Sequence, residues 1–93
     1  MSRLVILHRP LAGGASLAPL AGADTTILLR EDAVLLLRRP EFRETIGDLR
    51  LLVLEPDLRA RGLLAPQDGD AEAVDHAGFV RACVEHDQVV NWT

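Results

Sequence analysis

The chain has 93 residues, a formal charge of −4 and 48% hydrophobic residues, and its only aromatic side chains are two phenylalanines and one tryptophan. This length predicts a single domain over residues 1–93, and a weakly acidic chain with few stacking side chains is a poor direct binder of nucleic acid. So much aliphatic surface in so small a domain is typical of a subunit that buries part of that surface against a partner.

Three unbroken aliphatic runs predict strands with two buried faces, at residues 3–8, 25–30 and 50–55. Short helices are expected between the second and third of these strands, over residues 33–39 and 41–46. After the third strand, Pro56 is placed to open another helix, because its missing N–H costs nothing in a first turn. Gly62 is well placed to end that helix.

The C-terminal part of the chain predicts a brief fourth strand around Ala73 and a last helix over 76–88 that Asp75 caps. One apolar stripe of this helix is expected to face the core, formed by Phe79, Val80, Cys83 and Val84. The tail that follows is apolar enough to dock. The pattern predicts a small three-layer α/β fold, with an open, mainly parallel sheet of about four strands flanked by helices.

Cys83 is the only cysteine, so the fold does not depend on an internal disulfide. The apolar run near the start of the sequence has four residues, too few for a signal peptide or a membrane span, and we expect a cytoplasmic protein without a membrane contact. Cys83 lies late in its helix, where the dipole disfavours a thiolate. We interpret it as a structural cysteine, keep it as a minor nucleophile candidate and assign no other catalytic residue.

His8 follows the first strand, at the edge where open α/β sheets bind ligands, although it equally suits a bond to a neighbouring loop. Trp92 suits either an intermolecular contact or packing on the chain's own sheet.

No metal or cofactor is expected. The only candidate set of metal ligands is His76, Cys83 and His86, and it is unconvincing because His76 is two helical turns from the other two. Gly13-Gly14 lacks phosphate-loop spacing and is interpreted as a flexible loop. Glu31-Asp32 could act in acid–base chemistry, but such a pair more often favours the start of a helix.

Four segments resemble the TusB/DsrH family of sulfur-relay subunits: VILHRP, ILLREDAV, VLEPDLRARGL and FVRACVEHDQVVNW. The resemblance implies a DsrE-like fold and a heterohexamer with two related subunits, of the TusC/TusD or DsrF/DsrE type. It implies a relay in which a partner's cysteine persulfide delivers sulfur for 2-thiolation of the tRNA wobble uridine. It also makes His8, His86 and Trp92 candidate binding or interface residues.

The sequence departs from that family in two places. Residues 9–24 contain no cysteine, although the DsrH branch typically carries one there, and the family's Asp-Gly-Val turn reads Asp32-Ala33-Val34. The missing cysteine favours a TusB-like, non-catalytic subunit. Three alternatives stay open: a DsrH-like subunit in dissimilatory sulfur oxidation, a direct sulfurtransferase that uses Cys83, and a homo-oligomeric binding module with its ligand near His8.

Overall fold

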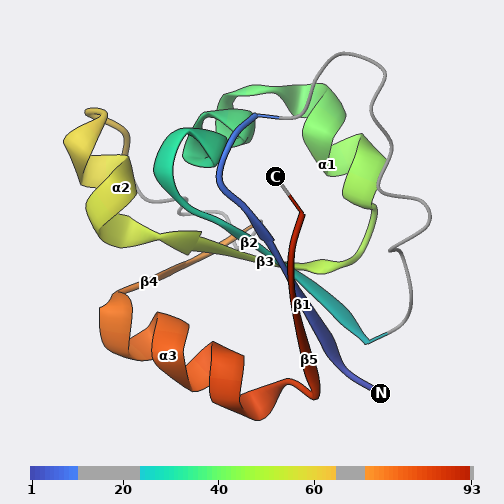
Figure 1. Ribbon diagram of the computed structural model, residues 1–93. Coiled ribbons are helices and arrows are strands. Elements are labelled where there is room, and N and C mark those ends of the chain that lie inside the picture. Colours follow the sequence, from blue (N-terminus) through green and yellow to red (C-terminus); the bar gives the residue numbers. More distant parts are fainter. Residues whose placement is uncertain (11–23, 65–70, 93) are drawn as a thin grey trace.

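The structure is a computed structural model that describes residues 1–10, 24–64 and 71–92. Its centre is a parallel sheet in the order β4-β3-β2-β1-β5 (Figure 1). The strands are β1 (Arg3–Leu7), β2 (Thr25–Leu29), β3 (Arg50–Leu54), β4 (Glu72–Val74) and β5 (Gln88–Asn91). The expectation of a loop at Gly13-Gly14 lies outside the described residues.

Helices cover both faces of the sheet. The 3₁₀ helix η2 and two α-helices lie on one face, and α3 lies on the other (Figure 1). Their bounds are η2 (Glu31–Arg38), α1 (Pro40–Ile46), α2 (Glu55–Ala60) and α3 (His76–Glu85). The expected three-layer α/β architecture is therefore confirmed. The segment expected as a first short helix is 3₁₀ helix in the structure.

Strand alternation divides the core into two clusters. Odd-numbered residues of β1, β2 and β3 pack under η2, α1 and α2, together with Phe42 and Leu58. Even-numbered residues of the same strands pack under α3, around Ala82. Because both faces are covered, the central and C-terminal residues of these strands are all aliphatic, which is why the unbroken runs could be recognised in the sequence.

The sheet has five strands rather than about four. The C-terminal tail forms β5, which pairs with β1 so that Leu4 lies opposite Val89, and the Trp92 N–H donates to the Ile6 carbonyl at 2.9 Å. The last helix accordingly ends at Glu85 and not at residue 88. His86 is already extended, with φ −96° and ψ 144°, because the chain must leave the helix to reach β1.

The expected apolar stripe of α3 is wrong for half of its members. Phe79 and Cys83 pack against the core with Ala82 between them, whereas Val80 and Val84 are 62% and 78% exposed. The contact of α3 with the sheet is centred on Ala82. Phe79, three residues before Ala82, and Cys83, directly after it, face the sheet, whereas the residue that follows each of them faces outward. The last helix therefore presents valines to its surroundings.

The ends of two helices agree with the sequence-based expectation. After α2, Gly62 has φ +69°, a left-handed conformation that glycine adopts at low cost, and the Leu63 N–H donates back to the Leu58 carbonyl at 2.9 Å. At the start of α3, Asp75 Oδ1 accepts a hydrogen bond from the Gly78 N–H at 2.7 Å. In the described parts of the chain, no helix has the length and hydrophobicity needed to cross a membrane.

Candidate functional site

The strand order creates a switch point between β1 and β5. From β1 the chain proceeds outward through β2 and β3 to β4, and it then returns to the other side of β1 to form β5. In open α/β sheets, ligands bind outside the carboxyl ends of the strands at such a point. His8 directly follows β1 and Trp92 directly follows β5, so the fold brings two of the candidate residues to this edge.

His8 and Trp92 differ in their placement at that edge. His8 is half-buried, and Trp92 is 42% exposed. Trp92 lies one residue beyond the pair Ile6–Asn91, so alternation assigns it to the η2 side of the sheet, whereas His8 continues the α3 side. The two residues are neighbours along the edge but belong to opposite faces.

The other end of β5 is held by contacts between Ser2 and Asp87. Asp87 Oδ2 accepts from the Ser2 N–H at 2.9 Å, and the Asp87 N–H donates to Ser2 Oγ at 2.9 Å. The Gln88 N–H then donates to the Ser2 carbonyl at 3.1 Å. These bonds set the register in which β5 reaches Trp92.

Replacing Asp87 with Ala is expected to lower the free energy of unfolding by about 1 kcal/mol, since an exposed hydrogen bond contributes on that scale. Amide hydrogen exchange should accelerate in β5 more than in β2. Glu85→Ala is the matched control, because Glu85 is exposed and makes no polar contact within the described residues. Equal acceleration of exchange in the two variants would contradict the assignment of an anchor to Asp87.

His86 lies away from this edge, before the amino end of β5. Its Nδ1 is 2.7 Å from the Ala82 carbonyl, and its Nε2 is 2.9 Å from Thr26 Oγ1. A carbonyl only accepts, so Nδ1 carries the proton, and in the neutral ring Nε2 accepts from the Thr26 hydroxyl. Both ring nitrogens thus join α3 to the sheet, and an interface role for His86 remains a prediction.

Cys83 lies in the last turn of α3 and is partly buried against the cluster that surrounds Leu4 and Leu28. His8 and Trp92 lie at the carboxyl edge of the sheet, whereas the end of α3 leads into the amino end of β5. The thiol is therefore separated from the switch point. Within the described residues, no three His, Cys, Asp or Glu side chains come close enough together to hold a metal ion.

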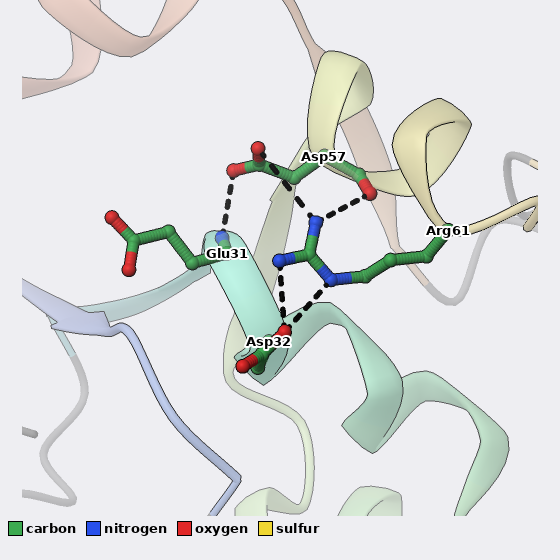
Figure 2. Close-up of polar contacts among 4 residues, drawn as sticks. All are labelled: Glu31, Asp32, Asp57 and Arg61. Atoms are coloured by element: carbon green, nitrogen blue, oxygen red, sulfur yellow. Dashed lines mark hydrogen bonds and ion pairs between the residues drawn. The ribbon is translucent and has the colours of Figure 1, made fainter.

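A polar cluster joins the segments that follow β2 and β3 (Figure 2). The Arg61 guanidinium donates to Asp32 Oδ1 through Nη2 at 2.8 Å and through Nε at 3.0 Å, and Nη1 donates to the Asp57 carbonyl at 3.1 Å. Asp57 Oδ2 in turn accepts from the Glu31 N–H at 2.7 Å. Figure 2 shows the Glu31 carboxylate pointing away from the other three side chains.

The backbone of Glu31 is strained, with φ +52°, a region that favours glycine. The hydrogen bond to Asp57 holds this residue where β2 turns into η2. From the sequence, Glu31-Asp32 was expected to favour the start of a helix, with acid–base chemistry as the alternative, and its link to Asp57 and Arg61 was missed. One feature of the sequence could have indicated this link: the residues of the polar cluster lie in two of the segments that resemble the family, ILLREDAV and VLEPDLRARGL.

The fold and this edge define a small three-layer α/β domain with a five-stranded parallel sheet and a switch point at His8. A protein-family model described as DsrH like protein matches residues 14–89, which is most of the chain. The chain belongs to this DsrH-like family, and the expected family resemblance is confirmed. Membership supports a role as a sulfur-relay subunit in general. The match does not include His8 or Trp92, and no curated protein matches the chain.

Proposed function

We propose that the chain is a non-catalytic subunit of a cytoplasmic sulfur-relay complex that supports persulfide transfer for 2-thiolation of the tRNA wobble uridine. Family membership supports the relay. The observation that carries the non-catalytic role is the position of the sole thiol, Cys83, half-buried against the core and far from the switch point. A sulfur carrier needs an accessible thiolate, favoured by positive charge or a helix N-terminus. Cys83 lies in the last turn of α3, away from the helix N-terminus.

The proposed partners are two related DsrE-like subunits, of the TusC/TusD or DsrF/DsrE type, and one of them supplies the persulfide cysteine. The support is an exposed apolar surface, here called the α3–β5 surface, formed by Val80 and Val84 of α3 and by Val89, which alternation places on the α3 side of β5. β5 is also an edge strand, so one row of its backbone groups has no neighbouring strand among the described residues. Burying these side chains against another subunit is favourable. Trp92, exposed beyond β5 on the η2 side of the sheet, is a separate candidate contact, since Trp is common at the centre of interfaces.

Replacing Cys83 with Ser is expected to leave sulfur transfer by the assembled complex nearly unchanged, because no step of the relay uses this thiol. The measurement is transfer of labelled sulfur from a persulfide donor to the acceptor of the complex, with assembly checked by size-exclusion chromatography. Cys83→Ala is the control for packing, since it removes the sulfur without adding a hydroxyl. Loss of transfer in both variants, with the complex still assembled, would overturn the non-catalytic role.

The partial exposure of Cys83 favours one rival, a direct sulfurtransferase that uses this thiol. Thiol labelling of the native protein separates the two: rapid reaction near neutral pH supports the rival, and protection until unfolding supports the proposal.

A second alternative, a homo-oligomeric binding module, is tested by the native mass after co-expression with the two candidate subunits. A stable complex with those subunits would count against the module. Thiolated tRNA content in a strain that lacks the gene separates tRNA modification from dissimilatory sulfur oxidation.

A further inference from the structure

An open pocket of about 390 Å³ lies at the amino edge of the sheet, where α1 ends and β3 and β4 begin. This edge is opposite the carboxyl edge that carries His8, so the pocket is separate from the switch point. Its volume is in the range of small-molecule sites, roughly 300–1,000 Å³. Four charged residues are part of its lining: Arg43, Asp48, Arg50 and Glu72.

Two of these four charges neutralise each other, and the other two have no counter-charge. Arg50 Nη2 donates to Glu72 Oε2 at 3.1 Å, and the two residues form an ion pair. In the described part of the chain, the Asp48 side chain makes no polar contact and Arg43 forms no ion pair. The pocket therefore presents a carboxylate and a guanidinium that are not paired with each other.

The Arg43 guanidinium is oriented by the turn that follows α1. Its Nη1 donates to the carbonyl of Gly47 at 3.2 Å and to that of Leu49 at 3.4 Å. Gly47 makes this turn with φ +62°, a conformation that favours glycine. Arg43 Nε and Nη2 make no hydrogen bond to any described residue, and neither nitrogen is buried. The Nε–Nη2 edge of this guanidinium is therefore held in one orientation and accessible to a ligand.

Arg61 shows what the same edge of a guanidinium binds elsewhere in this chain. Its Nη1 also donates to a backbone carbonyl, that of Asp57, whereas its Nε and Nη2 both donate to the Asp32 carboxylate (Figure 2). The edge suits a carboxylate because its two N–H groups are parallel and carry positive charge. Arg43 repeats the arrangement of Arg61 at Nη1 and lacks the carboxylate at the other edge.

We propose that this pocket binds a small zwitterion of the free α-amino acid class, with its carboxylate on the Nε–Nη2 edge of Arg43 and its ammonium group on the Asp48 carboxylate. A simple anion would be attracted by Arg43 and repelled by Asp48, and a simple cation would meet the reverse. A molecule that carries both charges satisfies both side chains. Binding at this edge is independent of the proposed relay function and of the partner subunits.

The test is a titration of the full chain with L-alanine near neutral pH, followed by NMR through the Arg43 Nε–Hε resonance and the backbone amide of Asp48. L-Lactate and L-alanine amide are matched titrants at equal ionic strength, since each keeps one of the two charged groups. We expect saturable shifts with L-alanine, and affinities lower by roughly tenfold or more for the other two, because each loses one charge-assisted contact. Shifts with L-alanine that do not saturate would overturn the site. Saturation by L-lactate or L-alanine amide at the same concentration would overturn the zwitterion class.

Variants show whether Asp48 and Arg43 make these contacts. Asp48→Asn should fold normally, since this side chain has no partner among the described residues, and it should weaken L-alanine binding by roughly tenfold, to the affinity of L-lactate. Arg43→Lys can still donate to the carbonyls of the turn but loses the Nε–Nη2 edge, so it should weaken L-alanine and L-lactate alike. Glu44→Gln is the matched control, because Glu44 is exposed on α1, is not part of the lining and makes no ion pair in the described ranges. Equal losses in Asp48→Asn and Glu44→Gln would contradict the site.

Discussion

Replacing Val84 with Arg is expected to weaken binding to the proposed partner subunits by about 2 kcal/mol or more, roughly a thirtyfold loss of affinity. Val84 is 78% exposed in the last turn of α3, and Val80 lies one turn earlier on the same side. A large charged side chain there must either be buried unpaired or hold the partner away. The measurement is the dissociation constant of the complex at fixed salt, by isothermal titration calorimetry.

The substitution should leave the isolated chain folded. Arginine has good helix propensity and suits the negative end of a helix dipole, so the stability of the isolated chain should change by less than about 0.5 kcal/mol. Leu64→Arg is the matched control, because Leu64 is 86% exposed and lies outside the α3–β5 surface. Unchanged affinity in Val84→Arg, or the same loss in Leu64→Arg, would show that the α3–β5 surface is not the contact.

Replacing Asp57 with Ala should lower the free energy of unfolding by about 2 kcal/mol, on the scale of a hydrogen bond to a charged group. The carboxylate is 23% exposed, accepts from the Glu31 N–H at 2.7 Å and lies 4.0 Å from the Arg61 guanidinium. Its loss leaves the strained Glu31 backbone without its acceptor. Urea unfolding followed by circular dichroism gives the free energy directly.

Three companion variants separate the contributions. Asp57→Asn keeps an oxygen for the Glu31 N–H but loses the charge, so a smaller loss is expected. Glu31→Gly should raise the free energy of unfolding by up to about 1 kcal/mol, both in the wild-type chain and in the Asp57→Ala variant, because glycine tolerates positive φ. Asp48→Ala should be nearly neutral, since Asp48 is exposed and makes no polar contact within the described residues. An Asp57→Ala variant as stable as Asp48→Ala would show that the polar cluster does not hold this turn.

The family-like segments have a physical basis in this polar cluster. ILLREDAV and VLEPDLRARGL lie apart in the sequence, yet Arg61 joins them through Asp32 and the carbonyl of Asp57. Sequence reasoning identified both segments by resemblance but could not pair them. Their contact depends on β2 and β3 being neighbours in the sheet, which follows from chain topology and not from local pattern.

The candidate site was predictable only in part. His8 could be placed at the carboxyl edge because the aliphatic run before it indicates a buried strand. The cation–π contact between Arg30 and Phe79 could not be predicted, since the two residues are distant in sequence. The same holds for the bond between His86 and Thr26. Such contacts depend on the packing of α3 across the sheet.

The sequence by itself determined the three buried strands, the ends of α2 and α3 at Gly62 and Asp75, and the family of the chain. These features depend on local signals: unbroken aliphatic runs, capping chemistry and residue order. Only the tertiary structure decided that the tail is a fifth strand and that Val80 and Val84 face outward. β5 is four residues long and exists because β1 offers it a free edge, and the orientation of α3 is set by its contact with the sheet around Ala82.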